Sequence, residues 1–396
     1  MKKLFALVFS GITVKIIFVN VVFSCTTFCL KSESELLFGR NYDWHIEYGI
    51  IFVNKKDVMK SASVRHESSA QWISKYGSVT FNQFGREFPN GGINEAGLVV
   101  ELMWLEQTEY PPKDNRPEVG GILQWIQYQL DNYSTVEEVI ESDKLVRIPE
   151  GSVPVHFLIT DSKGSCAVIE FLKGRLVSHS GKSLNYCVLT NDTYETSEKY
   201  YNHMSDSGKE NILNDENNSL NRFAKACSMI DRLKNLNIQP SVDYAFEILN
   251  EVSQKESTKW SIVYDINNKK IFYKTHSNQD IKSIDMKSQD FECSKPVMMI
   301  DVSAGKSENV NHLMGIYNYT ANRKLIEDAY DNVDFLKHIP EDERDIIASY
   351  PEKLTCTKKT GMINPENSVS DNLVIILLCS GLIGGVALVI IRHKFK

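Results

Sequence analysis

Val21-Val22-Phe23-Ser24-Cys25-Thr26-Thr27-Phe28 lies at the end of an apolar leader. A leader peptidase that cuts after Ser24 would make Cys25 the first residue of the mature chain. A cysteine in that position carries a thiol nucleophile and an α-amine base in one residue, so no separate histidine is needed to activate it. The stretch therefore predicts that the chain matures by losing its leader.

The leader itself, residues 1–24, has the order of a secretory signal. Lys2-Lys3 gives it a basic start, and two apolar runs, 4–14 and 16–23, follow. Two other interpretations stay open. In an uncleaved anchor Cys25 would never gain a free amine, and in a lipoprotein signal it would carry a lipid.

The other end of the chain favours a transmembrane helix. Residues 373–391 carry no charge over 19 positions, which at about 1.5 Å per residue would span a bilayer core. The basic tail 392–396 is expected in the cytosol, with the body anchored at the outer, extracytoplasmic face of the membrane. A cell-wall sorting signal has the same pattern, and the pair Gly381 and Gly385 favours helix pairing and hence a homo-oligomer.

Composition limits the remaining possibilities. Residues 25–351 are enough for one large ectodomain, and the polar segment 352–372 is typical of a stalk. The net charge of −7 argues against a nucleic-acid partner. Nine scattered histidines, without H-x-x-x-H or C-x-x-C, predict no metal site, and no cofactor is expected.

Cysteine usage fits one free working thiol. Of the eight cysteines, Cys379 lies in the predicted membrane segment, which leaves an odd seven outside it. Cys25 is expected to be free, and Cys166 and Cys187 lie on neighbouring strand-like runs that could bring them into a disulfide.

Apolar periodicity predicts an α+β layered body. The expected strands are 28–30, 36–40, 50–53, 98–105, 155–160, 166–172, 186–189, 260–264 and 270–274. Helices are expected at 122–130, from 134 and at 221–234, and a turn at 91–97. Ser134 is the expected N-cap of the second helix, with Glu137 completing a capping box.

Three short motifs carry side chains suited to assist Cys25. In Gly39-Arg40-Asn41-Tyr42-Asp43, an arginine near the thiol would favour the thiolate, and an aspartate near the α-amine would hold it when protonated. Thr190-Asn191 ends a strand, where the amide could donate into an oxyanion hole. Asn221-Arg222-Phe223 begins a helix. Taken singly, these residues are more often surface ion pairs or turn residues.

Taken together, these motifs resemble the choloylglycine hydrolase family, which holds bile salt hydrolases and penicillin V acylases. The matching segments are Cys25-Thr26-Thr27-Phe28, Gly39-Arg40-Asn41-Tyr42-Asp43, Gly92-Ile93-Asn94-Glu95-Ala96-Gly97-Leu98, Ser134-Thr135-Val136-Glu137-Glu138-Val139, Leu189-Thr190-Asn191, Asn221-Arg222-Phe223 and the late hairpin 260–286. The resemblance covers about residues 25–290, and the segment 295–350 has no counterpart that we can name.

The resemblance implies an N-terminal-nucleophile hydrolase with a four-layer αββα sandwich. Cys25 would be nucleophile and base, Arg40 and Asp43 would tune and hold it, Asn191 would be an oxyanion donor, and Arg222 a supporting cation. Bile salt hydrolases carry asparagine where this chain has Trp104, whereas penicillin V acylases carry an aromatic residue there. The backbone N–H of Trp104 could still bind the oxyanion.

The expected activity is therefore hydrolysis of non-peptide linear amides. The small-molecule substrates would be N-acyl amides, such as penicillin V, conjugated bile salts or N-acyl homoserine lactones. The rival interpretation is a non-catalytic surface protein, anchored by lipid or by a membrane helix, in which Cys25 is lipidated or disulfide-bonded and the ectodomain binds a ligand.

Overall fold

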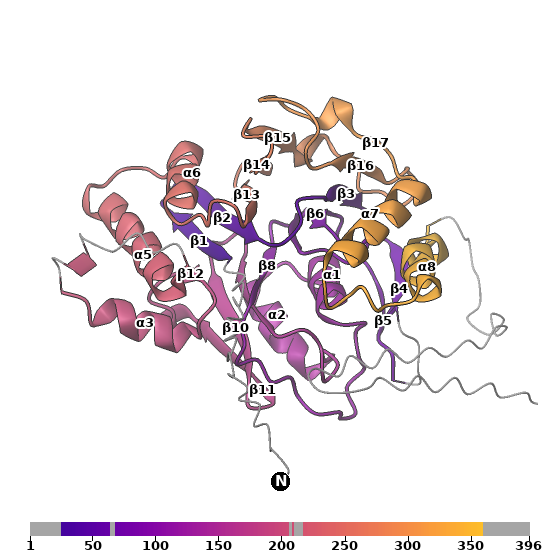
Figure 1. The fold of residues 1–396 in the computed structure, drawn as a ribbon, viewed down its shortest axis with the longest axis horizontal. Helices are drawn as coiled ribbons and strands as arrows, with labels where there is room; N and C mark the ends of the chain where they lie inside the picture. Colours follow the sequence, from indigo (N-terminus) through magenta and orange to yellow (C-terminus); the bar gives the residue numbers. More distant parts are fainter. Residues whose placement is uncertain (1–24, 64–67, 206–207, 210–216, 359–396) are drawn as a thin grey trace, which may run out of the picture.

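Two β-sheets packed face to face form the centre of the computed structural model, which describes residues 25–63, 68–205, 208–209 and 217–358 (Figure 1). The six-stranded sheet has the order β12 (Val188–Leu189), β1 (Thr26–Lys31), β2 (Leu36–Asp43), β13 (Thr258–Asp265), β14 (Lys270–Thr275) and β15 (Lys282–Asp285). Its neighbouring strands pair antiparallel. The strand that begins next to Cys25 is therefore paired on both sides.

The second sheet has nine strands. In order they are β11 (Arg175–Ser180), β10 (Cys166–Leu172), β9 (Val155–Thr160), β8 (Val99–Trp104), β7 (Gly91–Asn94), β6 (Ser78–Asn82), β3 (Ile50–Asn54), β16 (Met298–Asp301) and β17 (Gly315–Ile316). A small third sheet joins β18 (Thr355–Cys356), β4 (Val58–Ser61) and β5 (Gln71–Ile73).

Strand alternation separates two cores. On β9, Leu158 belongs to the core between the sheets, whereas Phe157 and Ile159 belong to a second core on the outer face. Because successive side chains of a strand point to opposite faces, a strand buried on both sides is expected to be mainly apolar on both. The runs 155–160 and 166–172 fit this rule, and β9 and β10 have the predicted bounds.

Helices cover the outer face of each sheet. Figure 1 shows α3, α5 and α6 together on one side of the molecule and α7 and α8 on the other. α5 packs on β1 and β12, α6 packs on β2 and β13, and α1 packs on β7 and β8. The helices are α1 (Ile122–Asn132), α2 (Val136–Glu141), α3 (Tyr194–Asn202), α5 (Ser219–Asn235), α6 (Val242–Glu251), α7 (Tyr319–Asn332) and α8 (Glu341–Ser349). The result is the layered α+β body that the resemblance implies.

The prediction of a C-terminal transmembrane helix is not retained. Within the described ranges, no helix has the length and apolar character that a bilayer core of about 30 Å demands. The longest, α5, has 17 residues and carries charged side chains such as Arg222 and Lys225. The predicted span 373–391 lies outside the described residues, as does the leader 1–24. The fold is corrected to the layered body alone, and membrane anchoring and a surface location are withdrawn with the helix.

The region after residue 295 packs on the nine-stranded sheet. Leu325 of α7 contacts Phe52 on the outer face of β3, so α7 extends the helical layer on that side. A disulfide joins Cys293 to Cys356, and β18 pairs with β4. Thr355 and Cys356, which fall in the segment expected to form a stalk, therefore contact the folded body.

Of three local predictions, one is confirmed and two are corrected. The disulfide between Cys166 and Cys187 is present. The capping box of α2 lies one residue later than expected, between Thr135 and Glu138. Residues 91–94 form the strand β7, whereas a turn was predicted there. Gly91 and Gly92 have no side chains, so residues of the neighbouring strands pack directly against the backbone of β7. A Cβ at Gly91 would collide with the carboxylate of Glu101.

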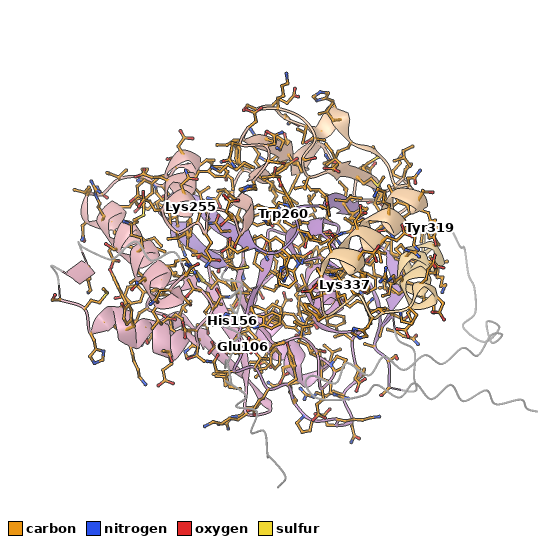
Figure 2. The ribbon with its side chains drawn as sticks, viewed as in Figure 1. Glu106, His156, Lys255, Trp260, Tyr319 and Lys337 are labelled. Carbon is orange, nitrogen blue, oxygen red and sulfur yellow. A yellow bond between two sulfur atoms is a disulfide. The ribbon has the colours of Figure 1, made fainter. Side chains whose placement is uncertain are left out.

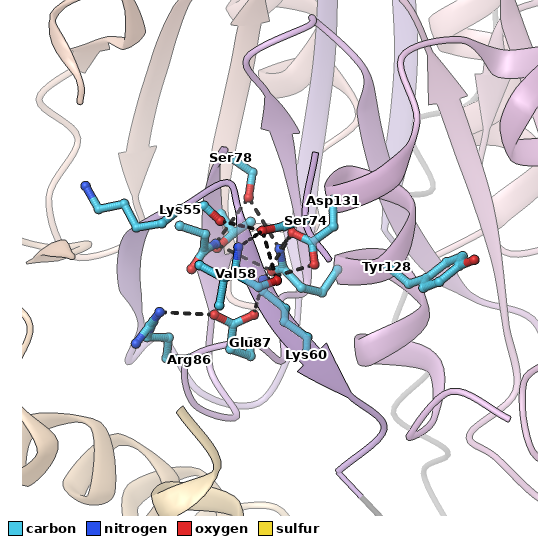
Figure 3. A network of polar contacts seen from close by, with 12 residues as sticks. Lys55, Val58, Lys60, Ser74, Ser78, Arg86, Glu87, Tyr128 and Asp131 are labelled. Carbon is cyan, nitrogen blue, oxygen red and sulfur yellow. Dashed lines mark hydrogen bonds and ion pairs between the residues drawn. The ribbon is translucent and has the colours of Figure 1, made fainter. Parts of the chain in front are cut away.

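A buried charge network lies under α1 (Figure 3). Lys60 donates to Glu87 at 2.5 Å and forms an ion pair with Asp131 at 3.0 Å, and all three side chains are at most 1% exposed. Arg86 lies 3.2 Å from Glu87, and Trp72 Nε1 donates to Asp131 at 2.7 Å. The network joins β4, β5 and α1.

We expect Lys60→Met to lower the free energy of unfolding by about 3–5 kcal/mol, because it removes the cation paired with buried Asp131 and leaves Glu87 with Arg86 alone. Burial already raises the pKa of Asp131, with Lys60 opposing that shift. Without Lys60 the pKa of Asp131 should rise further, so this carboxyl should take up a proton in the folded state and the loss should be larger at pH 8 than at pH 5. Urea denaturation at both pH values measures it.

Lys56→Met is the matched control. Lys56 is half-exposed and pairs with Glu95 at 3.5 Å and Glu292 at 3.2 Å, so its loss should cost less than about 1 kcal/mol. Equal losses in the two variants would contradict the stabilising role of the buried network.

Candidate active site

Cys25 lies at the start of β1, against the end of β2. Its side chain is 4% exposed. The Asp43 N–H donates to Cys25 Sγ at 3.5 Å, and Sγ lies 3.8 Å from the Asp43 carbonyl oxygen. Burial raises the pKa of the Cys25 thiol, and the Arg40 guanidinium partly offsets this shift. The thiol is therefore neutral at pH 7 and needs a base to become a nucleophile.

Arg40 is fully buried between the two sheets. It donates to the carbonyl oxygens of Asn90 at 2.8 Å and Leu102 at 3.2 Å, and it forms an ion pair with Glu101. Glu101 also accepts a hydrogen bond from Tyr264 at 2.5 Å. Since Glu101 neutralises much of its charge, Arg40 favours the thiolate less than an unpaired arginine would. Glu101 was not predicted as part of the site, although an acidic residue within an apolar strand is a usable signal.

Asp43 combines a fixed oxygen with an unpaired one. Oδ1 accepts a hydrogen bond from Thr258 Oγ1 at 2.5 Å, whereas Oδ2 is buried and has no hydrogen-bond partner among the described residues. Burial raises the pKa of Asp43 to about 6, against the opposing charge of Arg222. An unpaired buried carboxylate oxygen is costly and is suited to receive a cation. Thr258 was not predicted, and nothing in its local sequence marks it.

Asn191 is held at the end of β12 by contacts from three directions. Its Nδ2 donates to the Trp104 carbonyl oxygen at 2.8 Å, and its Oδ1 accepts from Arg222 Nη2 at 3.1 Å. Its backbone N–H donates to Ser219 Oγ, at the start of α5, at 2.9 Å. An amide nitrogen carries two hydrogens, so Nδ2 keeps one donor beyond the bond to Trp104.

Arg222 connects the two halves of this arrangement. Its Nε donates to Thr26 Oγ1 at 3.3 Å, beside Cys25, while its guanidinium also contacts Asn191 and its charge partly opposes the rise of the Asp43 pKa that burial causes. The location of Arg222 in the first turns of α5 places it against β1. Thr26, its partner, was quoted in the motif but given no role.

Trp104 ends β8, opposite Val155 of β9. Its backbone carbonyl contacts Asn191, while its indole Nε1 donates to Glu106 at 2.6 Å. The structure therefore brings all six predicted residues into one connected group, from Cys25 through Asp43 and Arg222 to Asn191 and Trp104, with Arg40 behind the thiol.

No metal site accompanies this group. Among the described residues, no three His, Cys, Asp or Glu side chains are grouped to hold a metal ion. A cavity of about 460 Å³ lies at the opposite end of β1, where Cys29, Lys31 and Cys187 contribute to its lining. None of the six predicted residues lines that cavity.

Comparison with known proteins agrees with this geometry. Residues 25–299 match the model of the linear amide C–N hydrolases, choloylglycine hydrolase family. Penicillin V acylase of Pectobacterium atrosepticum is 27% identical over 274 residues, which cover 59% of this chain and 72% of that protein. The match to the family model begins at Cys25.

Solved structures share the fold. Penicillin V acylase from Agrobacterium tumefaciens superposes with a TM-score of 0.62 at 21% identity, covering 74% of this chain and 98% of that one. A mutant of the conjugated bile acid hydrolase from Clostridium perfringens gives a TM-score of 0.58 at 21% identity, covering 73% and 99%. In both cases nearly all of the smaller protein is matched.

Proposed function

Because the chain belongs to the choloylglycine hydrolase family of linear amide C–N hydrolases, we propose that Cys25, freed by removal of residues 1–24, is its nucleophile. The observation that carries the proposal is the environment of Asp43. One oxygen of this carboxylate is fixed by Thr258, the other is unpaired, and its backbone contacts Cys25 Sγ. A protonated α-amine at residue 25 would be held by that carboxylate.

In the first half of the reaction, the α-amine of Cys25 takes the thiol proton and the thiolate attacks the acyl carbon. The negative charge that develops on the acyl oxygen is stabilised by the free Nδ2 hydrogen of Asn191 and the backbone N–H of Trp104. The ammonium then gives its proton to the leaving nitrogen as the C–N bond breaks. A thioester on Cys25 and a free amine are formed.

In the second half, water replaces the amine. The α-amine accepts a proton from water as the oxygen attacks the thioester carbon, and the C–S bond breaks with return of the proton to sulfur. An unperturbed α-amine titrates near about 7.7–8.0, so it can act as the base around neutral pH. Arg222 supports both steps by fixing Asn191 and balancing the charge of Asp43.

The substrate class we propose is an N-acyl amide with an aromatic acyl group. Trp104 is half-exposed beside Asn191, where an aromatic ring can contact an apolar acyl group. The two relatives that are penicillin V acylases act on such an amide, as their names state.

A hydrolysis panel tests this proposal. The protein with residues 1–24 removed should be incubated with penicillin V, a glycine-conjugated bile salt, an N-acyl homoserine lactone and a linear peptide, and the released amine measured. We expect release from N-acyl amides, fastest from penicillin V, and none from the peptide. Absence of hydrolysis of every amide, in protein whose first residue is shown by mass analysis to be Cys25, would overturn the proposal.

A further inference from the structure

His156 and Glu170 form a buried polar pair between the two sheets. Both residues are 0% exposed. The pairing of Phe157 with Ile169 in β9 and β10 places His156 opposite Glu170, and both side chains share the face that looks toward the six-stranded sheet. Figure 2 labels His156 well inside the molecule. Neither residue belongs to the six that the sequence predicted.

The pair contacts the turn that carries Asn191 on both sides. His156 Nε2 lies 2.7 Å from the carbonyl oxygen of Thr190, the residue before Asn191. His156 Nδ1 lies 3.2 Å from Glu170 Oε1, and the same oxygen accepts the backbone N–H of Tyr194 at 2.9 Å. Thr190 directly follows β12 and Tyr194 begins α3, so the pair holds both ends of the connection between these two elements.

Hydrogen bonding ties the pair to its surroundings. The Thr190 carbonyl oxygen and the Glu170 carboxylate are acceptors that face the two ring nitrogens of His156, and a ring N–H is the group that either acceptor can bind. Burial opposes ionisation of Glu170, but the hydrogen bond from His156 and the nearby His179 ring lower the Glu170 pKa to about 2. His179, 3.7 Å from Glu170 Oε2, has its own pKa raised by this contact.

Stability alone gives little reason for a polar pair at this place. The surrounding core between the sheets is apolar, with Leu158 and Val168 as the nearest residues on the same face of β9 and β10. Replacing both partners of a buried hydrogen bond by apolar groups of the same shape can be nearly neutral or stabilising. The pair is explained by what it holds, which is the backbone on either side of Asn191.

We propose that His156 and Glu170 are positioning residues that fix the direction of the Asn191 amide toward the acyl oxygen. This inference rests on the proposed function. The oxyanion contact strengthens in the transition state, so loss of positioning should lower kcat and leave KM nearly unchanged. A displacement of about 1 Å in such a group can cost up to about 100-fold in rate.

Two substitutions at one position separate the contacts. In His156→Gln the side-chain amide nitrogen replaces Nε2 and can still donate to the Thr190 carbonyl, while the contact with Glu170 is lost. In His156→Asn the shorter amide replaces Nδ1, keeps Glu170 and loses Thr190. Each variant loses one hydrogen bond, so we expect similar falls in thermal stability. Only His156→Asn should lower kcat, by about 10- to 100-fold.

The same substitution in a second background completes the test. Asn191→Ala alone should lower kcat by about 10²–10³-fold, and His156→Asn should add little to it, because His156 acts through Asn191. Thr160→Val is the control: Thr160 lies on the same face of β9, is 0% exposed and donates to Ser165 at 2.7 Å, away from Asn191. It should leave kcat unchanged.

The outcomes are distinguishable. If the wild-type protein hydrolyses an N-acyl amide but His156→Asn keeps its kcat, or lowers kcat equally with and without Asn191, the positioning role is wrong. If the wild-type protein hydrolyses no amide of the panel, the proposed function itself has failed.

Discussion

Replacing Cys25 with serine is expected to lower kcat for N-acyl amide hydrolysis by on the order of 10³-fold or more. A serine hydroxyl is a far weaker nucleophile than a thiolate, and the single α-amine must then remove a much less acidic proton. Binding should persist, because the contacts of Asn191 and Trp104 do not involve sulfur. Steady-state kinetics with penicillin V, together with unfolding curves, measure the two effects separately.

Cys29→Ser is the matched control for this prediction. Cys29 is a buried free cysteine on the same strand, four residues further on, and its Sγ contacts Thr160 rather than Asp43. It should retain nearly full activity. A protein that keeps Ser24 ahead of Cys25 should be as inactive as Cys25→Ser, because its residue 25 has an amide in place of the amine. Full activity in that protein would exclude the mechanism.

The second large effect is expected from Asp43→Asn. The substitution keeps the shape of the side chain but removes the charge that holds the ammonium of Cys25. We expect kcat to fall by on the order of 10²–10³-fold, within the range of general acid–base contributions. We expect a large effect because Oδ2 of Asp43 has no hydrogen-bond partner among the described residues.

The pH profile gives this prediction a second readout. In the uncleaved chain, in which Cys25 has no free α-amine, burial raises the pKa of Asp43 to about 6. A nearby ammonium would lower it, and the Asp43 carboxylate would in turn raise the pKa of that ammonium. Wild-type kcat/KM should therefore fall as the pH drops through the pKa of the α-amine, and Asp43→Asn should move this acidic limb to lower pH.

Stability should change in the opposite direction to activity. A raised pKa means that the folded protein binds a proton more readily than the unfolded chain, so Asp43 costs stability as pH rises through about 6. In the uncleaved protein, in which no ammonium faces Asp43, Asp43→Asn should therefore be at least as stable as the unsubstituted chain at pH 7. Asp265→Asn, buried on β13 and bonded to Asn268, is a control that should leave kcat intact. A destabilised Asp43→Asn, or one with normal kcat, would refute this account.

Local sequence patterns predicted much of the sandwich because its strands are buried on both faces. Runs such as 155–160 and 166–172 carry apolar residues on both faces, and β9 and β10 have those bounds. Gly91 and Gly92 gave the wrong prediction of a turn. In the structure they leave space for Glu101 and Thr80 on the neighbouring strands. That role depends on neighbours remote in the sequence.

The residues of the candidate site likewise divide into those that the local sequence predicts and those that it does not. Cys25, Arg40 and Asp43 lie within one hairpin, so their proximity follows from local pairing. Thr258 and His156 reach the site only through strand pairing and sheet stacking, and a single sequence carries no signal of either. The C-terminal helix was predicted from apolar length alone, a criterion that no described helix meets.

The disulfide between Cys293 and Cys356 has a consequence for how the protein must be handled. Its two cysteines are 63 residues apart in the sequence. Closing a loop of that length lowers the entropy of the unfolded chain and so stabilises the folded protein by about 4 kcal/mol. Both of its cysteines are half-exposed, whereas Cys25 is buried. A reductant added to keep the thiol of Cys25 reduced will reach this half-exposed disulfide before it reaches the buried thiol. Preservation of activity and preservation of the fold thus call for opposite redox conditions.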